Sequence, residues 1–311
     1  MNWPSFLPKP RLLVAAAASL TGSLPIIGWI GGAFFWPLDL FNHFQVQYAL
    51  VLLLTTVVLL CLKSRRAAIM SAALLLVPLA RIVPSHVAPD SKKPVGVPVR
   101  VASFNVFVSN DRYDDTLNWV REAAPDFIYF TETTEIWANE LERLGDVYPH
   151  SIEEGTGFAF YSKLPITSHE IIRCSDIEFP LLVARITTPN GEVTVFAVHP
   201  LPPVTRHWSE ALDEMMAVLA REVSRSSGPV IVAGDFNTTR WSHKSAPLQK
   251  VGLKDASHGK APGATWMRSN SLISIPIDRL LFRGEGMHCS RFEIGPELGS
   301  DHRPLISEFA W

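Results

Sequence analysis

Residues 230–237 have the sequence VIVAGDFN, in which a run of apolar residues ends in the polar group Gly234-Asp235-Phe236-Asn237. The apolar run is typical of a buried strand. A Gly-Asp pair followed by Asn is also ordinary turn chemistry, so we expect a turn where the strand ends. In α/β sheets, the loops beyond strand ends are where ligands usually meet polar groups. The stretch therefore predicts a strand that carries functional side chains at its end.

The same arrangement recurs at five other places along the chain. In each, a strand-like run is followed at once by polar side chains suited to phosphate or metal chemistry: Asn105, Glu132, His199, Asp278, and Asp301 with His302. One such segment alone would be weak evidence. Because the arrangement recurs, we expect these polar groups to converge on one site.

The segments between these runs predict helices, which makes the second part of the chain an α/β domain. Short apolar runs that predict strands lie at residues 99–104, 127–130, 157–161, 193–198 and 230–233. Helices are expected over residues 113–123 and 208–225. One face of the second helix carries the recurring apolar residues Leu212, Met215, Met216 and Leu219.

The ordered polar series resembles the pattern of the endonuclease/exonuclease/phosphatase superfamily. It consists of Asn105, Glu132, His199, Asp235 with Asn237, Asp278, and Asp301 with His302. The resemblance covers about residues 98–311. It implies an α/β fold, a four-layer sandwich in which two mixed β-sheets are flanked by helices. A small transmembrane helical domain ahead of such a sandwich resembles a bacterial membrane-anchored subgroup.

The resemblance implies a Mg²⁺ site in which Glu132 is the main ligand, with Asn105 and Asp301 beside it. Mn²⁺ is expected to substitute for Mg²⁺. Phosphoryl transfer needs a hard cation with oxygen ligands, so the residue types agree with this role.

The resemblance also implies the catalytic roles. Asp235 would orient or deprotonate the attacking water, and Asn237 would hold a phosphate oxygen. His302, oriented by Asp278, would stabilise the transition-state charge or protonate the leaving oxygen. His199 would make a second polar contact to the phosphate. An Asp–His pair fixes the tautomer of the imidazole and raises its basicity, which suits this task.

These residues also have structural interpretations. Asn105 could be a turn residue at a strand end, Glu132 a solvated charge or helix cap, and Asp278 a surface partner of Arg279. Many nucleic-acid-cleaving relatives carry an acidic residue two positions after the first Asn, whereas Phe107 occupies that position here. This departure removes one candidate metal ligand and weakens a nuclease assignment in particular.

Three apolar runs in the N-terminal part predict transmembrane helices. They cover residues 12–35, 44–62 and 67–83. A run of about nineteen residues at about 1.5 Å each spans nearly the ~30 Å core of a bilayer. The alternative is a cleaved signal peptide, since Lys9 and Arg11 precede an Ala-rich core. The apolar stretch continues past that core and two more candidate spans follow, which favours an anchor.

These runs divide the chain into three parts. We expect a membrane anchor with about three transmembrane helices over residues 1–83, a linker over residues 84–97 and a catalytic domain over residues 98–311. The short basic flanks before the first run and between the second and third should be cytoplasmic. Three spans then predict an integral protein of the inner, cytoplasmic membrane whose catalytic domain is extracytoplasmic.

The charge is divided unevenly between these parts. The first 96 residues hold eight Lys and Arg against two acidic residues, out of 28 basic and 30 acidic residues in the chain. The remainder therefore has 20 basic and 28 acidic residues, a formal net charge of −8. Such a domain is poorly suited to duplex DNA, whose binding relies on Lys and Arg.

The anchor would instead hold the site near lipid headgroups. We therefore expect membrane lipids as partners and a phosphorylated substrate, lipid-linked rather than nucleic acid; the sequence indicates no protein partner. A membrane-tethered endonuclease or exonuclease is one alternative, and a catalytically degenerate module that binds a phosphorylated ligand is another. The cysteines have no metal-ligand spacing, and Cys174 and Cys289 are either separate thiols or, in an oxidising compartment, a disulfide.

Overall fold

The computed structural model describes residues 9–87, 96–154, 157–260, 263–267, 270 and 272–311. The chain forms two compact units. The first comprises Met1–Val87 with Trp241–His243, and the second comprises Ala88–Arg240 with Lys244–Trp311.

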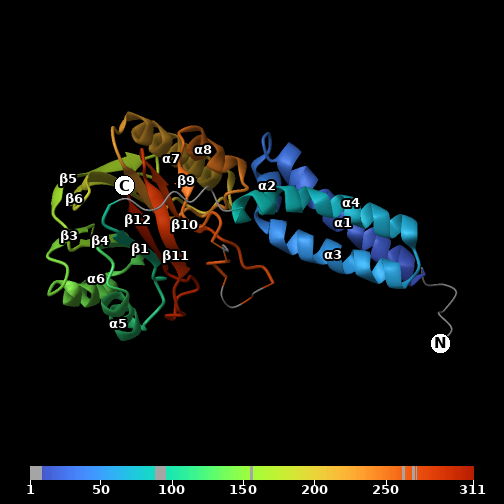
Figure 1. Ribbon diagram of the computed structural model, residues 1–311, viewed down its shortest axis with the longest axis horizontal. Coiled ribbons are helices and arrows are strands. Elements are labelled where there is room, and N and C mark those ends of the chain that lie inside the picture. Colours follow the sequence, from blue (N-terminus) through green and yellow to red (C-terminus); the bar gives the residue numbers. More distant parts are fainter. Residues whose placement is uncertain (1–8, 88–95, 155–156, 261–262, 268–269, 271) are drawn as a thin grey trace. The chain divides into compact units, whose positions relative to one another are not determined.

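The first unit is helical. Its long helices are α1 (Pro10–Gly31), α3 (Gln45–Cys61) and α4 (Arg65–Ile82), and its short ones are α2 (Trp36–Asp39), η1 (Leu40–Phe44) and η2 (Val83–His86). The three long helices lie side by side (Figure 1). Among the described residues, three helical segments are long and apolar enough to cross a membrane: Pro10–Gly31, Trp36–Cys61 and Arg65–His86.

Most buried positions of the long helices hold small or polar residues, with Tyr48, Leu52 and Leu59 of α3 as the large exceptions, whereas many large apolar residues face outward. A Cβ on Gly22 of α1 would collide with the side chain of Leu74 in α4. The buried hydroxyls of Thr55 and Ser71 lie 3.0 Å apart and join α3 to α4. Outward, Leu54 is 64% exposed and Ile69 is 69% exposed. This inverted pattern is typical of helices that pack within lipid.

The linker expected at residues 84–97 falls mainly on residues 88–95, which lie outside the described residues. Its first residues, up to His86, form η2 and continue α4.

In the described part of the second unit, two six-stranded sheets pack face to face. The first has the strand order β11-β12-β1-β2-β4-β3, and the second has the order β5-β6-β7-β8-β10-β9. The first sheet consists of β1 (Val99–Asn105), β2 (Phe127–Thr133), β3 (His150–Glu153), β4 (Gly157–Ser162), β11 (His288–Ile294) and β12 (Leu305–Ala310). The second consists of β5 (Ile166–Cys174), β6 (Phe179–Thr188), β7 (Gly191–Val198), β8 (Val230–Asp235), β9 (Lys254–Asp255) and β10 (Asp278–Arg283).

Helices cover the outer faces of both sheets (Figure 1). The first sheet is covered by α5 (Tyr113–Ala123) and α6 (Glu135–Leu141), which η3 (Glu142–Leu144) follows. The second sheet is covered by α7 (Arg206–Arg225) and α8 (Ala246–Lys250), which η4 (His243–Ser245) precedes. The four-layer α/β sandwich with two mixed sheets is therefore confirmed.

Three apolar clusters fill the spaces between the layers. In β1, Val99 and Val101 point into the cluster between the sheets, whereas Ala102 and Phe104 point into the cluster beneath α5 and α6. Strands that are buried on both faces read as near-continuous apolar runs, as Val230–Ala233 of β8 does. The third cluster lies beneath α7, and its buried residues include the predicted set Leu212, Met215, Met216 and Leu219.

The strand directions bring the site segments to one end of the sandwich. β1 is parallel to β2, and β7 is parallel to β8, so each pair ends at the same edge. β10 is antiparallel to β8, and its first residue, Asp278, pairs with Asp235 at the end of β8. β12 is antiparallel to β1, and Leu305 pairs with Ser103. The residues just before β12 therefore lie near the end of β1.

Candidate active site

The backbone at the site departs from regular strand geometry at two residues, Glu132 and Asn237. The register of β2 against β4 shifts between Thr131 and Thr133, so Glu132 occupies a bulge and has a φ of +60°. A bulge redirects a side chain at a strand end, and a positive φ in a non-glycine residue stores strain that functional sites commonly retain. Asn237, with a φ of +47°, is a second such residue.

Asp235 lies at the closed side of the site and is 1% exposed. Its Oδ1 accepts a hydrogen bond of 2.7 Å from the backbone N–H of Asn237, and its Oδ2 accepts one of 3.1 Å from Asn105 Nδ2. Burial raises the pKa of Asp235, although His302 and His199 act in the opposite direction. A carboxylate with a raised pKa is better able to accept a proton from water.

His302 and Asp278 form a buried pair beside Asp235. His302 Nδ1 lies 2.9 Å from Asp278 Oδ2, and His302 Nε2 lies 3.7 Å from Asp235 Oδ2. Burial disfavours the charged imidazole, but the Asp278 and Asp235 carboxylates outweigh it and raise the pKa of His302 to about 10. His302 is therefore a cation near neutral pH, with Nε2 directed toward Asp235.

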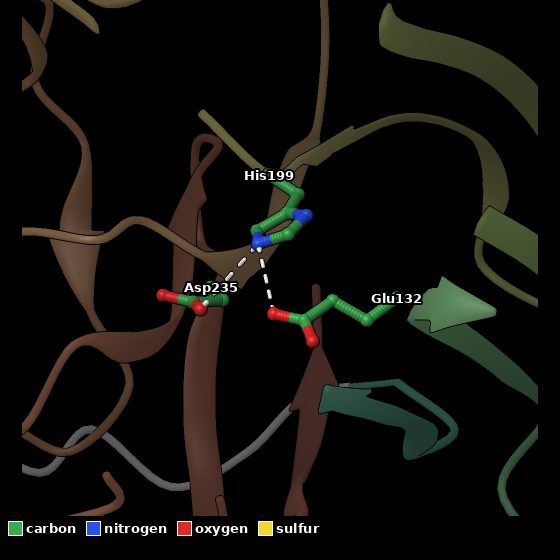
Figure 2. A group of neighbouring side chains, drawn as sticks. All are labelled: Glu132, His199 and Asp235. Atoms are coloured by element: carbon green, nitrogen blue, oxygen red, sulfur yellow. Dashed lines mark ion pairs between the residues drawn. The ribbon is translucent and has the colours of Figure 1, made fainter. Parts of the chain in front are cut away.

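Glu132 and His199 form the accessible side of the site. The imidazole of His199 faces both carboxylates (Figure 2). Its Nε2 lies 3.7 Å from Glu132 Oε1 and 3.7 Å from Asp235 Oδ2. The side chain of Glu132 is 26% exposed and that of His199 is 18% exposed. A substrate would thus approach past Glu132 and His199, with Asp235 and His302 behind them.

Two predicted amides have different placements. Asn105 Nδ2 donates to Glu132 Oε1 at 2.8 Å and to Asp235 Oδ2, while its Oδ1 accepts from the backbone N–H of Phe107. Asn105 therefore joins the two carboxylates through nitrogen and would present an oxygen to a cation only after its amide rotates. The amide of Asn237 donates to the carbonyl of Pro200 at 2.8 Å.

The donor set fits a hard divalent cation. Asp301 Oδ2 accepts a hydrogen bond from Trp266 Nε1, whereas Asp301 Oδ1 is buried and has no hydrogen-bond partner among the described residues. Glu132, His199 and Asp235 offer ligand atoms that all lie within 4.8 Å of one another. Oxygen-rich sets without thiolates suit Mg²⁺ or Mn²⁺.

Three further residues support the site and were not assigned by the sequence analysis. The Ser300 hydroxyl donates to the carbonyl of Asn105 at 2.8 Å and accepts from the backbone N–H of His302 at 2.9 Å. The Trp266 ring lies 6.4 Å from that of His302, and the Thr265 hydroxyl accepts from the backbone N–H of Asp278. Ser300 directly precedes Asp301, so its position was the available signal. The sequence of the loop that carries Thr265 and Trp266 contains no comparable signal.

The cysteines are outside this site. Cys174 is buried, Cys289 is half-buried, and both are free thiols.

A family comparison agrees with this geometry. The model of the endonuclease/exonuclease/phosphatase family matches residues 102–302. The chain therefore belongs to this family, whose members are metal-dependent phosphoesterases and nucleases.

Individual relatives are more distant. A UPF0294 protein of Vibrio parahaemolyticus is 26% identical over 130 residues, which cover 41% of this chain and 44% of that protein. The match thus spans less than half the length of that relative. A humanized D. rerio TDP2 superimposes with a TM-score of 0.58 at 18% identity, over 69% of this chain and 99% of that chain. The Neisseria 3′ phosphatase NExo, bound to product DNA hairpin, superimposes with a TM-score of 0.55 at 18% identity, over 68% of this chain and 100% of that chain. These structures share the fold.

Proposed function

We propose that this protein is a membrane-anchored, Mg²⁺-dependent phosphoesterase that hydrolyses a phosphate ester or anhydride, with a lipid-linked substrate favoured over nucleic acid. The observation that carries the proposal is the buried carboxylate of Asp235, 3.7 Å from an imidazolium that Asp278 holds in place. This arrangement offers a proton acceptor and a positive charge side by side. Hydrolysis of a phosphoester needs both.

In the proposed reaction, Asp235 accepts a proton from a water molecule whose oxygen attacks phosphorus. The bond between phosphorus and the leaving oxygen then breaks. His302 faces the developing negative charge with Nε2 and can donate its proton to a phosphate oxygen or to the leaving group. Because Asp278 binds Nδ1, the free nitrogen of His302 always points into the site.

Glu132 and Asp301 are the proposed ligands of the cation, and Asn105 joins them if its amide rotates. When bound, the cation would supply positive charge to the phosphate oxygens. Glu132 is half-buried and the Asp301 side chain is 35% exposed, so both can reach a ligand from the open side. His199, also on the open side, is proposed to contact the phosphate.

The preference for a lipid rests on charge and on the N-terminal helices. A formal net charge of −8 after residue 96 opposes the approach of a polyanion such as DNA. Three helices that could cross a membrane would hold the site near lipid phosphates and raise their effective concentration. The Neisseria 3′ phosphatase NExo is bound to a product DNA hairpin, and this likeness keeps a tethered nuclease as the alternative.

The test uses the purified full-length chain in detergent micelles. Hydrolysis of an isoprenoid diphosphate, a phospholipid, a soluble phosphate monoester and DNA is compared at matched Mg²⁺ and moderate salt. We expect turnover of a lipid substrate that EDTA abolishes and that Mg²⁺ or Mn²⁺ restores. Full activity in EDTA contradicts the metal requirement. Efficient, salt-sensitive DNA cleavage without lipid turnover favours the nuclease instead.

The matched variant is Asp235→Asn, which keeps the shape of the side chain but cannot accept the proton. Its turnover should fall at least about a hundredfold, the scale expected for loss of a general base. Glu170→Gln, an exposed carboxylate on β5, is the control and should retain full turnover. Equal turnover of wild type and Asp235→Asn would remove Asp235 from the reaction.

A further inference from the structure

The second unit distributes its exposed apolar side chains unevenly. Among its described residues, eight large apolar side chains are exposed, and two of these are Val97 and Val147. The other six, which we call the apolar rim, are Val108, Ile136, Val204, Trp208, Leu272 and Ile273. Single exposed apolar residues are ordinary, but a group of them around one place marks a contact surface.

The first part of the apolar rim follows β1 and β2 and adjoins the metal ligands. The backbone N–H of Val108 donates to Glu132 Oε2 at 3.4 Å. Ile136 lies in the first turn of α6, which begins three residues after Glu132. Val108 is 52% exposed and Ile136 is 59% exposed. Both therefore flank the open side of the site.

The second part follows β7. Val204 is 60% exposed and lies between His199 and the start of α7, whose N-cap is Thr205. Trp208 lies in the first turn of that helix and is 36% exposed. The loop is fixed to the site, because the carbonyl of Pro200 accepts a hydrogen bond from Asn237.

The third part precedes β10. Leu272 is 78% exposed and Ile273 is 41% exposed. They lie in the loop that leads to Asp278, and this loop also contains Trp266, which donates to Asp301. All three parts of the apolar rim thus lie on segments that also carry residues of the polar site.

Val147 provides the contrast. It lies in the turn after η3, next to Asp146, which pairs with Arg121 in the last turn of α5. Since α5 follows β1 and runs back along the sheet, its last turn lies at the end of the sandwich opposite the site.

The chain itself suggests what covers the apolar rim. Only twelve residues separate His86, the end of the last apolar helical segment, from Val99 at the start of β1. Fully extended, they span at most about 43 Å, which is on the order of the diameter of a domain of this size. A bilayer crossed by the helices would therefore always be within reach of the domain.

Charge decides between two modes of contact with a bilayer. The formal net charge of −8 after residue 96 makes attraction to anionic headgroups unfavourable. Apolar insertion does not depend on charge, and its strength scales with the apolar area that is buried. The exposed leucine, isoleucines, valines and tryptophan of the apolar rim supply that area.

We propose that the apolar rim inserts into the headgroup region of the bilayer that anchors the chain, so that the site opens directly onto lipid phosphates. The choice of substrate rests on the proposed function, whereas the insertion does not require catalysis. The two can therefore be tested separately.

The insertion test uses the full-length chain with Cys61→Ser and Cys289→Ser, reconstituted in phosphatidylcholine vesicles. A nitroxide is attached to Leu272→Cys or, as the control, to Val147→Cys. Accessibility to oxygen and to a water-soluble nickel chelate is then measured at low and high salt. We expect the Leu272 probe to favour oxygen at both salt concentrations and the Val147 probe to favour the chelate. Equal accessibility of the two probes, or a Leu272 probe exposed to water, overturns the proposal.

The activity test compares vesicle-borne isoprenoid diphosphate with a water-soluble phosphodiester, bis(p-nitrophenyl) phosphate. The double variant Leu272→Asp with Ile273→Asp should lower the ratio of vesicle to soluble turnover at least about tenfold, the scale of losing the burial of one large apolar side chain. Val147→Asp should leave the ratio unchanged. An unchanged ratio in the double variant contradicts the proposal. An immersed Leu272 probe without hydrolysis of either phosphoester supports the insertion and contradicts the proposed function.

Discussion

A buried ionic network supports the site from behind. Asp255 accepts hydrogen bonds from Arg279 Nε at 3.0 Å and from the Ser257 hydroxyl at 2.6 Å. The guanidinium of Arg279 lies 5.2 Å from the centre of the Phe236 ring. Phe236 stands between Asp235 and Asn237, and Arg279 directly follows Asp278. The network therefore fixes two strands that carry site residues.

Loss of the Asp255 charge should destabilise the second unit. Burial opposes the charged carboxylate, but Arg240 and Arg279 outweigh it and lower the pKa of Asp255 to about 2. Asp255→Asn leaves Arg279 buried without its partner, and breaking such a pair costs about 3–5 kcal/mol. Thermal and denaturant unfolding in detergent at pH 7, followed by near-ultraviolet circular dichroism, should detect this loss.

The same network makes the stability of the second unit depend on pH. The pKa of Asp255 in the folded protein lies below its unfolded value of about 4. Its contribution to the free energy of unfolding is therefore present above pH ~4 and is lost as pH falls toward about 2. The difference in unfolding free energy between wild type and Asp255→Asn should shrink over that range. Asp146→Asn, at an exposed pair, is the control and should change stability by less than about 1 kcal/mol. A difference that is constant from pH 7 to pH 2 would contradict this account.

At the scale of single residues, the sequence indicated which side chains gather but not how each one points. Glu132, His199, Asp235, Asp278 and His302 are brought together because each lies at or close to a strand terminus at one end of the sandwich. Their catalytic and metal-binding roles stay predictions. The orientation of the Asn105 amide toward two carboxylates depends on neighbours more than twenty residues away, which local sequence does not encode.

At the scale of elements, one glycine determines how β7 and β8 approach each other. Gly234 has a φ of +151°, and a Cβ on it would collide with the carbonyl oxygen of Val198. These two residues are directly paired in the parallel register. Any larger residue at position 234 would push apart the strands that carry His199 and Asp235.

Gly234→Ala should therefore cost both stability and turnover. We expect about 1–3 kcal/mol of overpacking cost beyond the backbone strain of a positive φ, together with at least about a tenfold loss of turnover because Asp235 is displaced. Gly191→Ala provides the matched control, since Gly191 has a φ of +101° but nothing within 4 Å of its added Cβ. Denaturant unfolding and turnover of both variants are compared. Equal losses in the two variants would mean that strain, and not the contact with Val198, explains the effect.

The elements themselves followed from the sequence where periodicity or continuous apolar character was strong. The helix expected over residues 113–123 matches α5, and the run expected at residues 193–198 forms most of β7. The bulge at Glu132 could not be predicted, because it arises from the pairing of β2 with β4. The same applies to β9, which has two residues and exists only through its pairing with β10.

At the scale of the whole molecule, the side of the membrane on which the site lies can be tested directly. Lys63, Arg65 and Arg66 flank the start of α4, and a basic flank is normally retained in the cytoplasm. A reporter fused after Trp311 should therefore be active outside the cytoplasm, and one inserted at Ser64 should be active inside. Parallel fusions to a cytoplasmic and an extracytoplasmic reporter control for expression. A cytoplasmic signal at Trp311 would mean that the chain crosses the membrane twice and not three times.

The central position of β12 has a consequence for how the protein is made. β12 lies between β11 and β1, and Asp301 and His302 immediately precede it. During translation, β1 and β2 can pair early, but the other edge of β1 stays open until the last described strand has left the ribosome. An open apolar edge is a site for aggregation, so the nascent chain would need protection during that interval. Under the proposed mechanism it would also be catalytically silent, because the imidazole that Asp278 holds toward Asp235 is supplied only when synthesis reaches residue 302.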